Sequence, residues 1–332
     1  MEDQNAPQPI GGTRSVAVLR PAALTVWAVA FVASAVLRGL PLDRASQTLW
    51  ILAVLFAANI GRSWSAKGRI LLDWLPFVGF LYLYDYTRGL ASLFGAPVHV
   101  TTAAAIDRVL GFGQVPTVAL QRALFDPGQL HWYDIVVSLT YFTHFFLVWV
   151  IAAFLYLRSR VQWAAWARRL IVLSYAGLLT FIVYPAAPPW YAAQHGVIGP
   201  VQRIATRGWD ALGLHTAGTL VQQGQAAAND VAAIPSLHAG FPLLVTLFFW
   251  RRAALWLRAV LVVYTATMAF ALVYGGEHYV TDILIGYGYG VATVVAVGWW
   301  ERHHRRSRSE ATEPERELTT ATSACTTTPG AQ

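Results

Sequence analysis

The chain has 332 residues, of which 56% are hydrophobic and 12% are charged, and its mean hydropathy is +0.46. Soluble domains carry about 25% charged residues, so this composition excludes an ordinary soluble globule and indicates an integral membrane protein. The net charge of +7 does not indicate a nucleic-acid partner, because the cations gather in short loops between apolar runs. The single cysteine, Cys325, excludes an intrachain disulfide and a cysteine metal cluster, whereas the nine histidines could still bind a metal ion.

Eight apolar stretches predict membrane helices, since about 20 mostly apolar residues cross a bilayer core of roughly 30 Å. They lie at about 22–40, 46–61, 68–87, 132–156, 168–185, 235–250, 254–274 and 280–300, and the second stretch is short for a span. Strand-like alternation is lacking, and backbone polar groups cannot stay unpaired in lipid. We therefore expect an all-α fold, a polytopic bundle of about eight transmembrane helices in a membrane domain at 21–300.

The basic loops predict the orientation of these helices. Arginine and lysine cluster at 62–69, 158–169, 251–258 and 302–308, and they fall on the same side as the N-terminal segment 1–20. The positive-inside rule makes that side cytoplasmic. We expect a multi-pass protein of the cell membrane with both termini in the cytoplasm, and the polar tail at 301–332 is expected to be disordered.

Two long segments then face the extracytoplasmic side. The segment at 88–131 contains helical spacing at 103–110, which predicts a helix lying at the membrane interface. The segment at 186–234 is rich in Gln, Ala and Gly, and we expect it to cap a site. The alternative for both segments is a plain surface loop.

Two short motifs lie at the outer ends of apolar runs. His278 and Asp282 are four residues apart, so a helix would place them on one face, where the carboxylate can orient the imidazole as a nucleophile or base. The alternative is a pair that only caps a helix. In the second motif, Ser236 precedes His238 at the start of an apolar run, where free amides and the helix dipole favour a phosphate oxyanion. An ordinary capped helix start is the alternative.

Three blocks, Tyr184–Tyr191, Ala233–Gly240 and Gly275–Asp282, resemble in order and spacing the type 2 phosphatidic acid phosphatase superfamily, in the branch containing fungal inositol phosphorylceramide synthase. The resemblance implies a six-helix phosphatase-like core at about 68–300 and phosphotransfer without a metal or other cofactor. It implies that His278 attacks phosphorus, and that His238 protonates the leaving group and then activates the acceptor. The implied substrate is a membrane lipid phosphate or phospholipid, with water or an alcohol as acceptor.

The first block departs from the superfamily pattern, which has a lysine and an Arg-Pro pair where Pro185 to Tyr191 contains no cation. We expect Arg88 to bind phosphate in their place, since guanidinium offers a bidentate fork. The alternative is an interfacial arginine paired with Asp85 or with lipid headgroups. Trp190 and Tyr191 are expected to form a substrate wall, or else part of the aromatic belt.

Other interpretations remain open at this point. Tyr141 and His144 lie within a predicted span, where a polar residue is a functional candidate, although a neutral histidine bonded to a neighbouring helix is the simpler reading. A lipid or solute transporter could use the same histidines for binding. A metalloenzyme could use His238, His278 and Asp282 as ligands.

Overall fold

The computed structural model describes residues 12–41, 43–90, 95–212 and 229–325. Its regular elements in these ranges are helices, which confirms the all-α prediction. In chain order they are α1 (Gly12–Arg38), α2 (Arg44–Ala58), α3 (Trp64–Leu90), α4 (Thr102–Leu110), α5 (Pro116–Leu124), α6 (Trp132–Thr143), α7 (Leu147–Arg158), α8 (Arg160–Val183), α9 (Pro189–Gln194), α10 (Gly208–Ala211), α12 (Leu237–Phe249), α13 (Leu255–Tyr274) and α14 (Val280–Cys325).

The helices support four or five candidate membrane spans, fewer than the eight predicted. Within the described residues, α1, α8, α13 and the first part of α14 are long and apolar enough to cross a bilayer, and the bent pair α6–α7 makes a fifth. The predicted spans at α2 and α12 form apolar helices of 15 and 13 residues, short of the usual length. In α3, Asp73 and Asp85 interrupt the apolar sequence. The eight-span topology stays a prediction.

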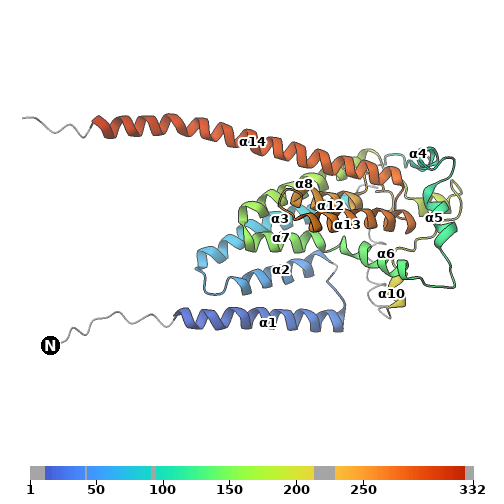
Figure 1. Cartoon of the computed structure of the whole chain (residues 1–332), viewed down its shortest axis with the longest axis horizontal. Helices are drawn as coiled ribbons and strands as arrows, with labels where there is room; N and C mark the ends of the chain where they lie inside the picture. The colour runs from blue at the N-terminus through green and yellow to red at the C-terminus, as the bar shows by residue number, and fades with distance from the viewer. Residues whose placement is uncertain (1–11, 42, 91–94, 213–228, 326–332) are drawn as a thin grey trace, which may run out of the picture.

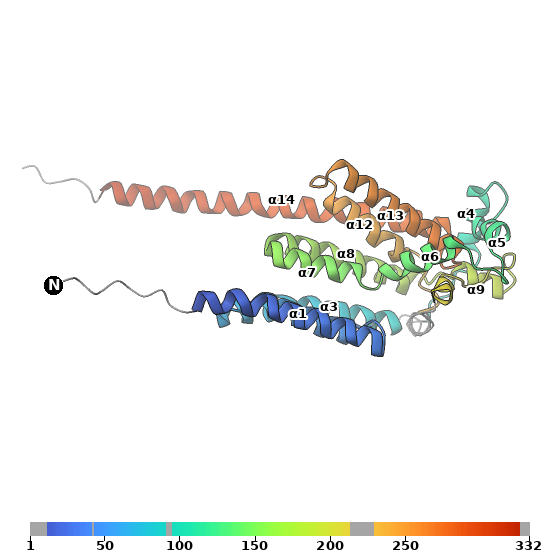
Figure 2. The ribbon, with the colours of Figure 1, turned by 60° about the horizontal axis from the view of Figure 1, so that its bottom comes forward.

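The two ends of the bundle consist of different helices (Figures 1 and 2). The beginning of α1 and the far end of α14 lie at one end, and the short helices α4, α5, α9 and α10 gather at the opposite end. The helix α14 extends well past the bundle and continues to Cys325. The disorder of the tail from Glu301 stays a prediction.

Glycines allow α12 and α14 to approach closely. A Cβ atom added to Gly286 of α14 would lie 2.2 Å from the carbonyl oxygen of Ser236, and one added to Gly240 would lie 3.2 Å from the carbonyl oxygen of Gly286. Neither site has room for a larger side chain without a shift of backbone. The crossing therefore brings the start of α12 against the first turns of α14.

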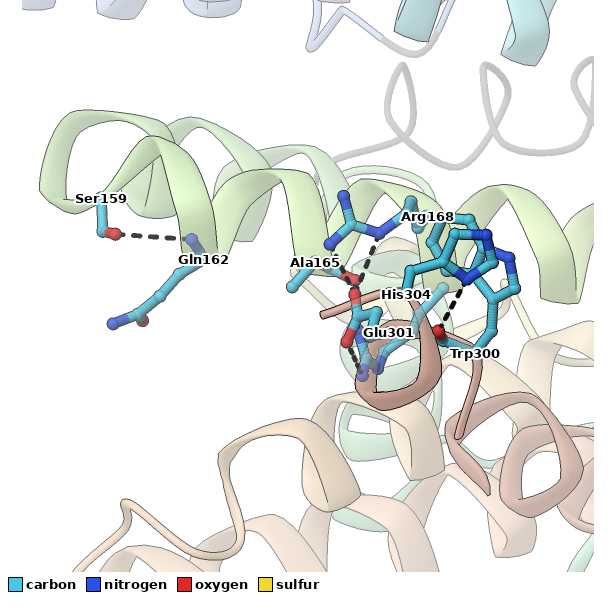
Figure 3. Close-up of polar contacts among 8 residues, drawn as sticks. Ser159, Gln162, Ala165, Arg168, Trp300, Glu301 and His304 are labelled. Atoms are coloured by element: carbon cyan, nitrogen blue, oxygen red, sulfur yellow. Dashed lines mark hydrogen bonds and ion pairs between the residues drawn. The ribbon is translucent and has the colours of Figure 1, made fainter. Parts of the chain in front are cut away.

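A second connection joins α14 to α8 at the end of the bundle away from the short helices. Arg168 and Arg169 of α8 both bond the carboxylate of Glu301, with 2.9 Å between Arg169 Nη2 and Glu301 Oε2. Figure 3 shows Arg168 against Glu301, and the ring of His304 bonded to the carbonyl oxygen of Trp300 one turn earlier. The two connections fix α14 along the bundle.

Candidate active site

His278 lies in a tight turn between α13 and α14. The helix α13 ends at Tyr274, and Gly276 follows with φ +78°, a conformation that glycine adopts without strain. The helix α14 starts only at Val280. The expectation that His278 and Asp282 share one helix is therefore wrong for His278, because the glycine turn ends the preceding helix and the next one starts after the histidine.

Asp282 contacts His278 across this helix start. Its Oδ2 atom accepts a hydrogen bond from the amide of Tyr279 at 2.9 Å and lies 3.4 Å from His278 Nδ1. Both side chains are buried, with 0% of Asp282 and 5% of His278 exposed. The carboxylate thus caps the helix and also contacts the imidazole, the two roles that the sequence left open as alternatives.

Asp107 of α4 holds the same helix start from the other side. Its carboxylate accepts hydrogen bonds from the amides of Val280 at 3.0 Å and Thr281 at 2.9 Å, and from the Thr281 hydroxyl at 2.7 Å. The side chain is fully buried. The sequence did not reveal this role, since nothing local to 103–110 indicates a partner some 170 residues later.

The two histidines of the motifs come together. His278 Nε2 and His238 Nδ1 are 3.4 Å apart, although the residues are 40 positions apart in sequence. Because a carboxylate only accepts hydrogen bonds, Asp282 assigns the proton of His278 to Nδ1 and leaves Nε2 as the lone pair. The proton between the two rings then belongs to His238 Nδ1. This is the arrangement that a histidine nucleophile with a neighbouring acid requires.

Ser236 has a structural place beside this pair. Its hydroxyl accepts a hydrogen bond from the amide of Ala239 at 3.3 Å and so caps α12, and its own amide donates to the carbonyl oxygen of Asp282 at 3.1 Å. It is fully buried and is not one of the cavity-lining residues. The structure does not bring Ser236 to the cavity; the first residues of α12 that line it are Leu237 and His238.

A cavity of about 400 Å³ opens beside the histidines. One part of its lining is apolar and comes from α3, α7, α8 and α12 and from the turn between α6 and α7; it consists of Leu81, Phe145, Val148, Leu170, Phe181, Leu237 and Phe241. The other part carries charges from α2, α3 and the connecting segments, namely Asp43, Arg44, Asp85, Arg88, Arg203, Asp230 and Glu277. The lining is therefore amphipathic.

Arg88 lines the cavity at the end of α3. Its guanidinium carbon lies 5.9 Å from the centre of the Tyr84 ring, and its buried Nε atom has no hydrogen-bond partner in the described part of the chain. Asp85, the partner that the alternative interpretation requires, pairs with Arg44 instead. Arg88 thus has its charge at the cavity and keeps donors available.

Two further arginines reach the cavity, and both are paired. Arg203 bonds Glu277 through two atoms at 2.9 and 3.0 Å and lies over the Trp190 ring at 5.0 Å. Burial acts to lower the pKa of Arg203, but the attraction of Glu277 outweighs it and raises the pKa. Arg44, bonded to Asp85, was missed in the sequence because it precedes a stretch that reads only as a short apolar helix. Arg203 therefore stays charged.

The aromatic candidates separate into two groups. Trp190 lines the cavity, whereas Tyr191 stacks on His195 at 4.1 Å and is not among the lining residues. Tyr141 and His144, which the sequence left open, both line the cavity, and their rings stack on His238 at 5.2 and 3.8 Å. The cap predicted at 186–234 supplies lining residues on either side of 213–228, which lie outside the described residues.

The described side chains contain no group of three or more His, Cys, Asp or Glu arranged to hold a metal ion. In particular, His238 contacts His278 directly and Asp282 lies behind His278, so the three form a chain of contacts. Such a chain passes a proton or orients a ring, and it does not converge on one point.

Comparison with known proteins agrees with this site. The family model described as the PAP2 superfamily matches residues 103–299, more than half of the sequence, and the chain therefore belongs to the PAP2 superfamily. It is 24% identical over 232 residues to the phosphoinositol dihydroceramide synthase of Bacteroides thetaiotaomicron, covering 66% of this chain and 73% of that protein. No solved structure matches the chain significantly. The predicted family is confirmed, and the protein is a membrane enzyme of that superfamily; Arg44 and Arg88 lie outside the matched range.

Proposed function

We propose that the protein is a lipid phosphotransferase that works through a covalent phosphohistidine at His278. The observation that carries this proposal is the chain of contacts from Asp282 through His278 to His238, placed at a cavity with an apolar wall and three arginines. The arrangement supplies a nucleophile, a group that orients it and an acid beside it. Arg88 stabilises the negative charge of the phosphate, and the first backbone amides of α12 also donate hydrogen bonds to it.

In the first step, the lone pair of His278 Nε2 attacks phosphorus. The new N–P bond forms as the P–O bond to the leaving alcohol breaks. His238, which enters this step as the imidazolium, gives its Nδ1 proton to the departing oxygen and becomes neutral. Because a phosphorus atom must enter between the two rings, their 3.4 Å contact has to open during turnover. Asp282 stabilises the positive charge that develops on His278.

In the second step, an acceptor hydroxyl attacks the phosphohistidine. His238, now neutral, takes the hydroxyl proton; the O–P bond forms, and the N–P bond breaks to restore His278. Water as acceptor makes the enzyme a phosphatase, and an alcohol makes it a transferase. We favour the alcohol, because the relative named phosphoinositol dihydroceramide synthase is a synthase by name.

The donor we propose is a phospholipid with a hydroxyl-rich headgroup of the phosphoinositol type, and the acceptor is a lipid alcohol. The apolar lining offers contact to acyl chains, and the carboxylates and arginines offer hydrogen-bond partners to phosphate and hydroxyl groups. The site is expected to face the extracytoplasmic side, where the positive-inside rule places the short helices.

The test uses purified protein with phospholipids labelled on phosphorus, including phosphatidylinositol, phosphatidylglycerol and phosphatidate, each with and without ceramide or diacylglycerol. We expect label to appear in the lipid acceptor as the neutral lipid is released from the donor, and both to vanish in His278→Ala. Turnover of a water-soluble phosphate ester with no product from any lipid would contradict the lipid assignment. Movement of intact labelled lipid across vesicles without P–O cleavage would instead favour a transporter.

A further inference from the structure

The break between α6 and α7 is built into the wall of the cavity. The two helices are bent by 52° relative to each other. Between them, the amides of His144, Phe145 and Phe146 bond carbonyl oxygens three residues back, at 3.2, 3.1 and 3.3 Å. Gln47 of α2 donates its side-chain amide to the carbonyl oxygen of Phe145 at 3.0 Å. Backbone outside a regular helix is tolerated within a membrane domain only where protein covers it or where it lines a cavity, and both conditions hold here.

This break presents the ring of His144 to His238. The two ring centres are 3.8 Å apart and the planes are inclined by 29°, so the rings lie nearly face to face. Phe241, on the same helix as His238, lies against His144 at 5.6 Å. The buried Nδ1 atom of His144 has no hydrogen-bond partner among the described residues. The contact between the histidines is therefore made by ring faces and not by a shared proton.

We propose that His144 is a positioning residue that keeps the plane of the His238 imidazole directed at phosphorus while the gap to His278 opens. A stacked ring can shift parallel to its partner with little loss of contact, whereas a tilt separates the faces. His238 must move in that way when phosphorus enters between its Nδ1 atom and His278 Nε2. The inference rests on the proposed function, because it assigns His144 to the proton transfer that His238 performs there.

The experiment compares His144→Phe with His144→Leu, two substitutions of similar bulk of which only the first keeps a flat ring. We expect His144→Phe to retain kcat within about threefold of the unchanged enzyme. In His144→Leu we expect kcat to fall by about 10- to 100-fold with little change in KM, because a misplaced catalytic group costs up to about 100-fold. Phe154→Leu, an exposed position on α7, is the control for an unrelated change in the bent pair.

A second readout does not depend on turnover. In protein labelled with 15N-histidine, the imidazole signals of His238 should move in His144→Leu and stay in place in His144→Phe. Native kcat and unmoved signals in His144→Leu would overturn the proposal. Equal loss in both variants would also overturn it, because the ring nitrogens of His144 would then matter and not its face. If the unchanged enzyme transferred no phosphate, the proposed function would fail, and the NMR comparison would still decide whether His144 positions His238.

Discussion

Arg88 is the charged side chain of the cavity whose guanidinium is least engaged by other residues. Arg44 and Arg203 each bond a carboxylate, whereas Arg88 contacts the Tyr84 ring and has a buried Nε atom without a partner among the described residues. A planar guanidinium with available donors suits bidentate contact to phosphate. Arg88 lies outside the range matched by the family. We propose from its place at the cavity that it replaces the cations missing from the block at 185–191.

We predict that Arg88→Lys lowers kcat/KM by about 10-fold, because the charge remains but the fork is lost. Arg88→Gln should cost about 100- to 1,000-fold, the usual effect of removing a group that stabilises transition-state charge. Steady-state kinetics with the preferred lipid measures both, and Arg62→Gln, an exposed arginine in the loop between α2 and α3, is the control. Native kinetics in both Arg88 variants would move the role to Arg44 or Arg203.

Residues joined by a short local pattern could be predicted from the sequence, and residues joined only by packing could not. The motifs predicted that His238, His278 and Asp282 belong together, and the structure brings these side chains into contact. Ser236 and Tyr191 belong to the same set of sequence blocks, but their side chains have other contacts. Ser236 caps α12, and Tyr191 stacks on His195. The place of Arg44 at the cavity could not be predicted, because it depends on how α2 packs against α3.

Among the elements, the pair α12 and α14 decides the distance between the two histidines. His238 lies in the first turn of α12, and His278 lies two residues before α14 begins. Any separation of the two helices therefore separates the rings. The sequence predicted both helices, but not their close crossing at Gly286, since a glycine in an apolar helix has no unique interpretation. Nor did it predict the bend between α6 and α7, because residues 132–156 contain no proline or glycine to mark a break.

We predict that Gly286→Ala impairs both stability and turnover. The added methyl group would lie 2.2 Å from the carbonyl oxygen of Ser236, and overpacking of this kind costs about 1–3 kcal/mol. Gly288→Ala is the matched control, because its Cβ would meet nothing within 4 Å and alanine favours a helix. The unfolding temperature in detergent and kcat should both fall in Gly286→Ala. In Gly288→Ala they should stay level or rise slightly. Equal behaviour of the two variants would contradict the close crossing.

On the scale of the whole molecule, the short helices α4, α5, α9 and α10 lie at one end, and the beginning of α1 and the far end of α14 lie at the other. The cavity is lined by Arg88 near the end of α3 and by Trp190 of α9. The all-α bundle could be predicted from hydropathy. The number of crossings stays a prediction, because α2 and α12 are short and α3 carries two aspartates. Hydropathy measures composition, whereas a short helix inside a bundle is stabilised by its neighbours.

We predict that the cavity end faces away from the cytoplasm. In a Cys325→Ser background, Phe112→Cys should react with an impermeant thiol reagent added outside intact cells, since Phe112 is 99% exposed in the turn after α4. Arg62→Cys, in the loop between α2 and α3, should react only after the cells are opened. The reverse pattern would invert the topology and place the site in the cytoplasm.

The most direct test of the central claim is to trap the covalent intermediate. Enzyme mixed with phosphorus-labelled phospholipid is quenched in base, which preserves phosphohistidine, and its peptides are mapped by mass spectrometry. We predict an adduct on His278 that carries the phosphoryl group with its headgroup, that forms as fast as the neutral lipid is released, and that is absent from His278→Ala. Full turnover without an adduct, or an adduct on any other residue, would contradict the account.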